Sequence, residues 1–188
     1  MSLIRETARR ASWVLLGVGI LLLVYAAYVV IDARIYEARV LRRLAQDRSA
    51  RVAVPQPVEG AGIGAIRIGR LGLSAVVVQG ESEAILQRAV GHLVRTALPG
   101  NEGNVVLAGH RDTLFRPLKD ILEGDRITLQ TAEREFEYVV ESTSIVTPTD
   151  VGVIEPSGGH TLTLITCFPF YYVGPAPKRF IVVARETE

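Results

Sequence analysis

The sequence contains a single cysteine, Cys167, in 188 residues. One thiol cannot form a disulfide within the chain, so a fold held by paired cysteines is excluded. The three histidines, His92, His110 and His160, form neither an HExxH motif nor a Cys/His cluster. A zinc site would therefore have to borrow carboxylate ligands. The lone thiol needs another explanation.

The chain also lacks an excess of charge of one sign. It has 21 Lys and Arg against 20 Asp and Glu, for a formal net charge of +1. No dense run of basic residues occurs beyond the first fifty positions, so the electrostatic surface of a nucleic-acid-binding protein is missing. The rest of the chain has about the size of one ordinary domain, so we expect one hydrophobic core.

One long stretch without any charge lies near the amino terminus, at residues 13–31, with the sequence WVLLGVGILLLVYAAYVVI. A helix rising about 1.5 Å per residue would nearly cross a hydrocarbon core of roughly 30 Å. Every face of this helix is apolar, and charged residues rather than a small-residue cleavage site come after it. We predict a retained transmembrane helix rather than a cleaved signal peptide, with residues 1–12 as a short cytoplasmic tail.

Residues 32–60 are predicted to form a juxtamembrane helix and a Pro-containing linker. Helix-forming residues dominate its first part, whereas Pro55 and Pro57 forbid helix and favour an extended chain. The composition changes again near Gly60. A folded domain is therefore predicted over residues 61–188.

This domain consists of short apolar runs that are rich in β-branched residues and separated by glycines. Seven or eight strands in about 125 residues indicate an all-β barrel or sandwich. Only residues 81–88 and 113–121 have a helical pattern, the first with Ser82 as the expected N-cap. The predicted strands are IGAIRI, LSAVVVQ, NVVLAGH, RITLQT, EFEYVVESTSIV, HTLTLITC and RFIVVARE.

Cys167 stands at the end of the run TLTLITC. By strand alternation it shares a face with Thr161, Thr163 and Ile165. It either packs as a small apolar residue or faces a groove as a nucleophile. Thr166 lies on the opposite face, so its hydroxyl is expected to serve the fold or the floor of a groove more than the reaction.

Two other side chains are predicted at strand ends. His110 follows a buried strand where the chain becomes polar, a place where a histidine can exchange protons. Arg179 opens the last strand, and it lies at the same sheet end as Cys167 if their strands are neighbours. A thiol, an imidazole and a guanidinium together supply what acyl transfer through a thioester needs. His92 and His160 fit structural or turn positions, although His92 could line a pocket.

The segments LAGHRD and TLITC, with Arg179 about a dozen residues after the cysteine, resemble the sortase family. The resemblance extends over residues 62–185 and is most like class D sortases. It implies an eight-stranded sortase barrel with one or two short helices, preceded by the transmembrane helix. It also implies a cysteine transpeptidase in which Cys167 is the nucleophile, His110 the general acid/base and Arg179 the stabiliser of substrate and oxyanion.

The resemblance implies partners as well. A sortase cleaves a sorting signal of the Leu-Pro-x-Thr-Gly type in secreted proteins and transfers them to an amine, such as a peptidoglycan precursor or a protein lysine. The enzyme would sit in the cytoplasmic membrane of a bacterium, with its amino terminus inside and residues 61–188 outside. Two alternatives remain: a sortase-like peptidase that resolves the thioester with water, and a non-enzymatic tethered β-domain that binds envelope peptides.

The loop over residues 168–178 is predicted to be either a specificity element or a hydrophobic lid. No cofactor is expected. Calcium is possible, but the acidic residues Glu133, Glu135 and Glu137 alternate along a strand and more readily form a solvated face. The predicted substrate-contact residues are His92, Thr166, Phe168, Tyr171 and Tyr172.

Overall fold

A computed structural model of the chain describes residues 57–150, 152–155, 158–172 and 174–187, together with the helical positions 20, 21, 25 and 31. The chain divides into two compact units, Met1–Tyr36 and Glu37–Glu188. Within the described part, we find no helix with the length and apolar character needed to cross a membrane. The predicted transmembrane helix at 13–31 and most of the segment 32–60 lie outside the described residues and stay predictions.

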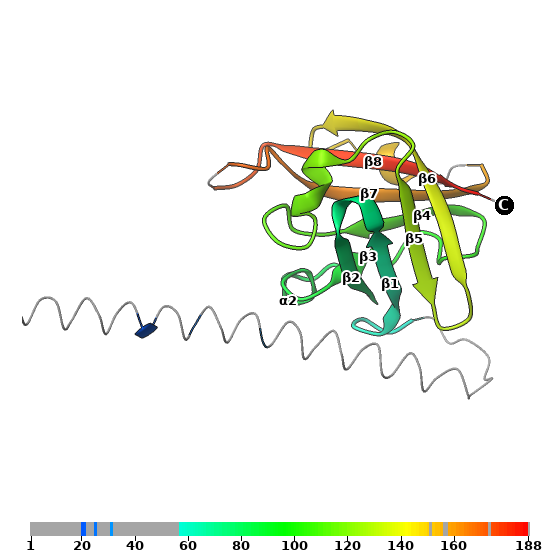
Figure 1. The fold of residues 1–188 in the computed structure, drawn as a ribbon, viewed down its shortest axis with the longest axis horizontal. Coiled ribbons are helices and arrows are strands. Elements are labelled where there is room, and N and C mark those ends of the chain that lie inside the picture. Colours follow the sequence, from blue (N-terminus) through cyan, green and yellow to red (C-terminus); the bar gives the residue numbers. More distant parts are fainter. Residues whose placement is uncertain are drawn as a thin grey trace, which may run out of the picture. The chain divides into compact units, whose positions relative to one another are not determined.

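Eight strands close into a barrel in the order β1-β2-β3-β4-β7-β8-β6-β5 (Figure 1). The all-β, eight-stranded prediction is therefore confirmed, and seven strands fall on the seven apolar runs. The eighth, β3, has only three residues. The strands are β1 Gly62–Ile68, β2 Leu73–Gln79, β3 Val90–His92, β4 Gly103–Ala108, β5 Arg126–Thr131, β6 Glu135–Val146, β7 His160–Phe168 and β8 Lys178–Glu186.

Within residues 57–187, the helices that the structure describes are short and lie in the connections between strands. They are η1 Gly69–Leu71, α2 Glu83–Leu86, η2 Arg116–Asp120 and η3 Gly152–Ile154. Both predicted helical segments are present, but shorter than expected, and η2 is a 3₁₀ turn. Ser82 does occupy the N-cap position of α2, although its side chain makes no capping hydrogen bond.

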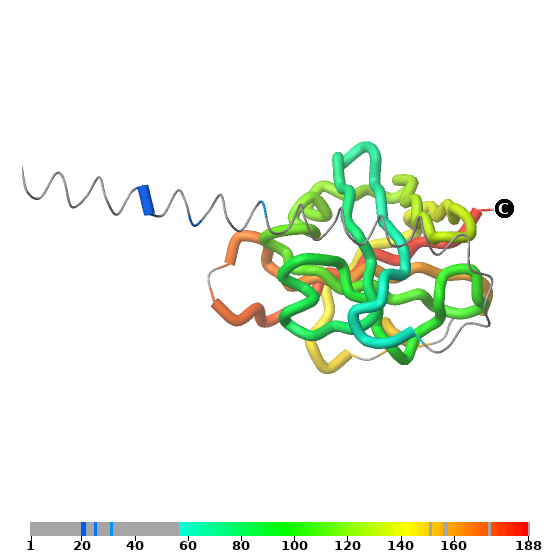
Figure 2. The backbone as a smooth tube through the Cα atoms, turned by 90° about the horizontal axis from the view of Figure 1, so that it is seen from below, coloured from blue at the N-terminus to red at the C-terminus, as the bar shows by residue number. Residues whose placement is uncertain are grey.

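Two strand pairings set the position of the site. The pairing of β4 with β7 is parallel, whereas the pairing of β7 with β8 is antiparallel. The carboxyl ends of β4 and β7 therefore meet at the same barrel end as the start of β8. The loop between β7 and β8, orange in Figure 2, extends beyond that end of the barrel in both views.

The barrel interior is filled by apolar side chains that all eight strands contribute. Alternation sends Leu162 and Leu164 of β7 inward, together with Val105 and Leu107 of β4. Fully burying one such side chain contributes roughly 1.5–3 kcal/mol, so the strands form a firm support for the loops. The connection between β4 and β5 joins this core through Phe115, which is completely buried.

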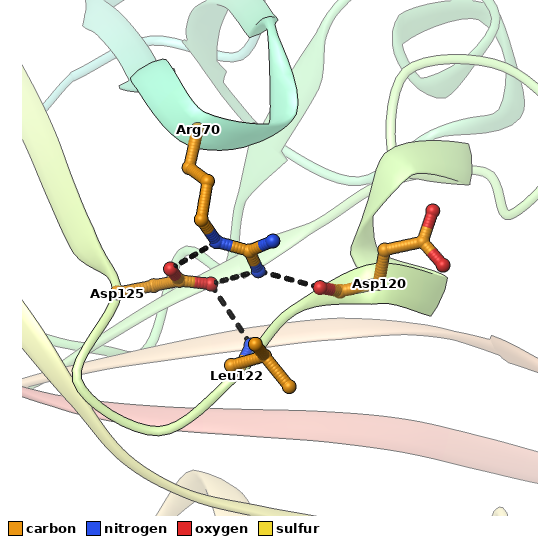
Figure 3. Close-up of polar contacts among 4 residues, drawn as sticks. All are labelled: Arg70, Asp120, Leu122 and Asp125. Atoms are coloured by element: carbon orange, nitrogen blue, oxygen red, sulfur yellow. Dashed lines mark hydrogen bonds and ion pairs between the residues drawn. The ribbon is translucent and has the colours of Figure 1, made fainter.

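A buried carboxylate fixes the far end of that same connection (Figure 3). Asp125 accepts hydrogen bonds from Nε and Nη2 of Arg70, at 2.5 and 2.6 Å, and from the Leu122 N–H at 2.8 Å. Nη2 of Arg70 also donates to the Asp120 carbonyl. The hydrogen bonding by Arg70 lowers the pKa of Asp125, and burial opposes this only in part. The β1–β2 connection is thereby joined to the entry of β5.

Candidate active site

Cys167 and Arg179 are direct cross-strand neighbours in the β7–β8 pair. Residues opposite each other in an antiparallel pair project on one face, with Cβ atoms about 4.5–5.5 Å apart. Cys167 is the second-last residue of β7, and its thiol is free and partly exposed. The prediction that the two strands are neighbours, with both residues at the same sheet end, is confirmed.

His110 reaches the same place through the β4–β7 pairing. The ladder continues one residue past the end of β4: the Gly109 N–H donates to the Ile165 carbonyl at 3.1 Å. The Gly109 carbonyl in turn accepts from the Thr166 hydroxyl at 2.7 Å. His110 and Cys167 are the next residues of the two segments. The strand predicted to end at His110 ends two residues earlier, so the imidazole belongs to the loop.

Gly109 is required for this path. A Cβ atom at this position would lie 2.8 Å from the ring of Phe115, which is completely buried. The same Phe115 closes the turn, because its N–H donates to the His110 carbonyl at 3.0 Å. A side chain at Gly109 would therefore push against the core and displace the histidine.

The outer face of β4 and β7 changes from buried to accessible along its length. Asn104 and Thr163 are buried, and η3 covers them: Asn104 Nδ2 donates to the carbonyls of Val153 and Glu155 at 3.2 and 3.3 Å. The Thr163 hydroxyl donates to Asn104 Oδ1 at 2.8 Å. Toward the ends of both strands the outward residues become partly exposed, and Cys167 is the last of them. The thiol thus lies where this face opens to solvent.

The imidazole of His110 has an acidic neighbour that the sequence did not reveal. Its Nε2 lies 3.4 Å from Oε1 of Glu83, the first residue of α2. Gln87 Nε2 donates to the same carboxylate oxygen at 3.3 Å. Glu83 is 71% exposed, so water screens this pair and its interaction energy is small. An acidic residue in a first helical turn is ordinary and gave no signal of this contact.

The guanidinium of Arg179 is held by its own loop. Nη1 donates to the carbonyls of Lys178 and Ala176, at 3.0 and 3.3 Å. An arginine side chain has five N–H donors, and both of these bonds use the same nitrogen. These two bonds leave the N–H groups of Nε and Nη2 unused.

The aromatic rings at the β7–β8 loop pack as predicted for a hydrophobic lid. Phe168, Phe170 and Phe180 form an aromatic cluster with centroid distances of 5.3 to 6.4 Å, and two of these rings pack on the core. Tyr171 and Tyr172 are 74% and 47% exposed. The phenylalanines thus form a packed lid, and Phe168 faces away from Cys167 by alternation. Substrate contacts by the two tyrosines stay a prediction.

The structure places His92 and Thr166 inside the domain. His92 is 1% exposed, with Nδ1 2.9 Å from Gln79 Oε1 and Nε2 2.8 Å from the Ala97 carbonyl oxygen. Burial lowers the pKa of His92. Thr166 is 2% exposed and bonded to the backbone. These contacts support a structural role for both residues in place of the predicted substrate contacts. The remaining histidine, His160, opens β7.

Two of the three acidic residues considered for calcium form ion pairs with different arginines. Glu135 lies 3.4 Å from Arg67, and Glu137 lies 3.0 Å from Arg126. Glu133 is exposed in the turn before β6. In the part of the chain that the structure describes, no group of three or more His, Cys, Asp or Glu is arranged to hold a metal. That the protein needs no cofactor stays a prediction.

Comparison with known proteins settles the family. The family model for the sortase domain matches residues 66–187. The chain belongs to the sortase family. Sortases are cysteine transpeptidases, so this chain is an enzyme of that type. Sortase D of Bacillus subtilis (strain 168) is 34% identical over 140 residues, which cover 74% of this chain and 71% of the relative.

Solved structures of other sortases have the same fold. A Clostridium perfringens Sortase D5 transpeptidase has a TM-score of 0.71 at 25% identity, covering 81% of this chain and 99% of that one. Sortase E1 from Streptomyces coelicolor, solved with a tripeptide in its active site, has a TM-score of 0.63 at 29% identity, with coverages of 68% and 88%. The sortase resemblance and the barrel that it implies are confirmed.

Proposed function

We propose that this sortase is a class D-like transpeptidase that cleaves a Leu-Pro-x-Thr-Gly-like sorting signal and transfers the protein to an amine of the cell envelope. The observation that carries the proposal is the pairing of Cys167 with Arg179, beside the segment of His110, at an accessible end of the barrel. The similarity to Sortase D of Bacillus subtilis supports the class. The alternative of a non-enzymatic tethered domain supposed a packed, buried Cys167, whereas Cys167 is partly exposed.

The first half-reaction forms a thioester. The Cys167 thiolate attacks the carbonyl carbon of the signal's threonine, and the carbonyl oxygen becomes an oxyanion. Arg179 donates hydrogen bonds to this oxygen, a contribution that typically changes kcat by about 10²–10³. The peptide C–N bond then breaks, and His110 gives a proton to the departing amine.

The second half-reaction releases the thiolate. An incoming amine attacks the thioester carbonyl, His110 takes a proton from it, and the C–S bond breaks to leave a new amide. A peptidoglycan precursor or a protein lysine has the required amine. Water in place of the amine would make the enzyme a peptidase.

We further propose that residues 13–31 anchor the enzyme in the cytoplasmic membrane of a bacterium, with the barrel outside. The uncharged run nearly crosses the hydrocarbon core of a bilayer when it is helical. Proteins with carboxy-terminal sorting signals and the amines of the cell wall are both found on that side. A nucleic-acid partner does not belong to this proposal, because the charge of the chain is balanced.

The test incubates the full chain with a panel of Leu-Pro-x-Thr-x peptides, with and without a small primary amine. Mass spectrometry should find the amino-terminal peptide fragment on Cys167 as a thioester, and on the amine after turnover. The Cys167→Ala variant should give neither product. Cleavage by that variant, or no cleavage of any peptide by the wild type, would overturn the proposal. Release of free acid alone in the presence of amine would favour the peptidase.

A further inference from the structure

We infer that Arg111 is a positioning residue that ties the β7–β8 loop to the segment carrying His110. The inference rests on the proposed function, because its consequence is the alignment of nucleophile and acid/base group. Arg111 comes directly after His110 in the chain, and the β7–β8 loop begins just after Cys167 and ends at Arg179. A contact that holds these two segments together therefore affects the relative positions of all three predicted catalytic residues.

The contacts of Arg111 are specific to the loop backbone. Its Nη2 donates to the Tyr172 carbonyl at 2.7 Å and to the Gly174 carbonyl at 3.0 Å. Its guanidinium carbon also lies 5.8 Å from the centre of the Tyr172 ring, within the range of a cation–π contact. Because these hydrogen bonds go to backbone carbonyls, they fix the path of the loop backbone and do not depend on the loop side chains. One arginine thus holds the middle of the loop at two points.

The connection that starts at His110 is fixed at its other end as well, where the Arg70–Asp125 pair holds the chain at the entry of β5. Within this connection Lys119, in η2, lies 2.8 Å from the Asp120 carboxylate. The Arg111 contacts therefore tie the loop to a connection that has its own support.

A second nitrogen of the Arg111 guanidinium favours a positioning role. Its Nη1 is buried and has no hydrogen-bond partner among the residues that the structure describes. A buried donor without a partner is costly and is retained where the rest of the group is needed. The two carbonyl contacts and the ring contact supply that need.

The experiment compares the full chain with its Arg111→Met and Arg111→Lys variants. Arg126→Met is the matched control, since Arg126 is an exposed arginine ion-paired with Glu137 on the neighbouring strand. The first readout is backbone hydrogen exchange of residues 170–176 without any peptide. Arg111→Met should speed this exchange roughly two- to tenfold, the value of about one net hydrogen bond. Arg111→Lys should restore part of the protection, and Arg126→Met should change nothing.

The second readout is turnover of the sorting peptide. Misplaced catalytic groups should lower kcat about ten- to hundredfold in Arg111→Met, with a smaller change in KM. Unchanged exchange in this variant would overturn the inference. A raised KM with unchanged exchange would instead make Arg111 a peptide contact and overturn it as well. If the wild type processes no peptide, the proposed function fails while the exchange result still decides whether the tether exists.

Discussion

Replacing Thr166 with valine tests whether β7 holds the segment that carries His110. The Thr166 side chain is 2% exposed, and its hydroxyl donates to the Gly109 carbonyl at 2.7 Å. Valine keeps the shape of the side chain but removes the donor. A buried polar group left without its partner costs about 1–3 kcal/mol. For a domain of this size, a loss of about 2 kcal/mol should lower Tm by roughly 6–12 °C.

The assay is thermal unfolding of the purified full chain, together with its peptide turnover. Thr166→Ser is the matched variant, because it keeps the hydroxyl and loses only a methyl group, worth about 0.8 kcal/mol. Thr143→Val is the control on an exposed position of β6, where a change within about 0.5 kcal/mol is expected. Turnover should fall in Thr166→Val more than in Thr166→Ser, since Gly109 directly precedes His110.

Two results would refute this reasoning. Thr166→Val could be as stable as the wild type, in which case the hydroxyl bond does not hold the two segments together. Alternatively, Thr166→Val could lose stability while keeping full turnover at a temperature where it is folded. The position of His110 would then not depend on this contact.

Three other buried residues, Asp125, His92 and Gly109, each lead to a prediction. Because Arg70 holds the pKa of Asp125 below its ordinary value of 3.8, Asp125→Asn should cost about 1–2 kcal/mol in urea unfolding at neutral pH. The difference should shrink below about pH 4, where the unfolded chain takes up the proton first, and should be lost once the native carboxylate is protonated too. Burial lowers the pKa of His92 below 6.5, so the unfolded chain binds a proton at this imidazole more readily than the native protein does. The free energy of unfolding should therefore fall from pH 7 to about pH 5, and it should fall less in His92→Gln. Gly109→Ala should cost about 1–3 kcal/mol and reduce turnover by pressing on Phe115; a variant with wild-type stability and activity would contradict the steric argument.

Most of the barrel could be predicted from the sequence, because its strands form apolar or alternating runs over six or more positions. The exception is β3, with only three residues, Val90–His92, all of them buried. Such a segment has no alternation to detect, and it exists because β2 and β4 pair with its two edges. The helical segments were placed correctly but predicted too long, since only one turn of each is supported by packing.

The site was predictable to the extent that it depends on neighbouring strands. Cys167 and Arg179 belong to consecutive strands, so their pairing results from a single loop. The place of His110 depends on the parallel β4–β7 pairing, which residue spacing does not show. The family resemblance supplied only the expectation that His110 acts together with Cys167. Glu83 and Arg111 were missed because a charged residue in a turn usually faces solvent, and only the structure shows what each one touches.

The two arginines at this end of the barrel, Arg111 and Arg179, donate hydrogen bonds to different parts of one loop. Arg179 donates to the carbonyls of Ala176 and Lys178, near the start of β8, whereas Arg111 donates to carbonyls in the middle of the loop. A loop released by loss of the Arg111 contacts would also change the carbonyls that orient Arg179. Substitution of Arg111 should therefore reduce oxyanion stabilisation even though it leaves Cys167, His110 and Arg179 unaltered. A fall in kcat of Arg111→Met with all three predicted catalytic residues intact is the result expected if the β7–β8 loop helps to align them.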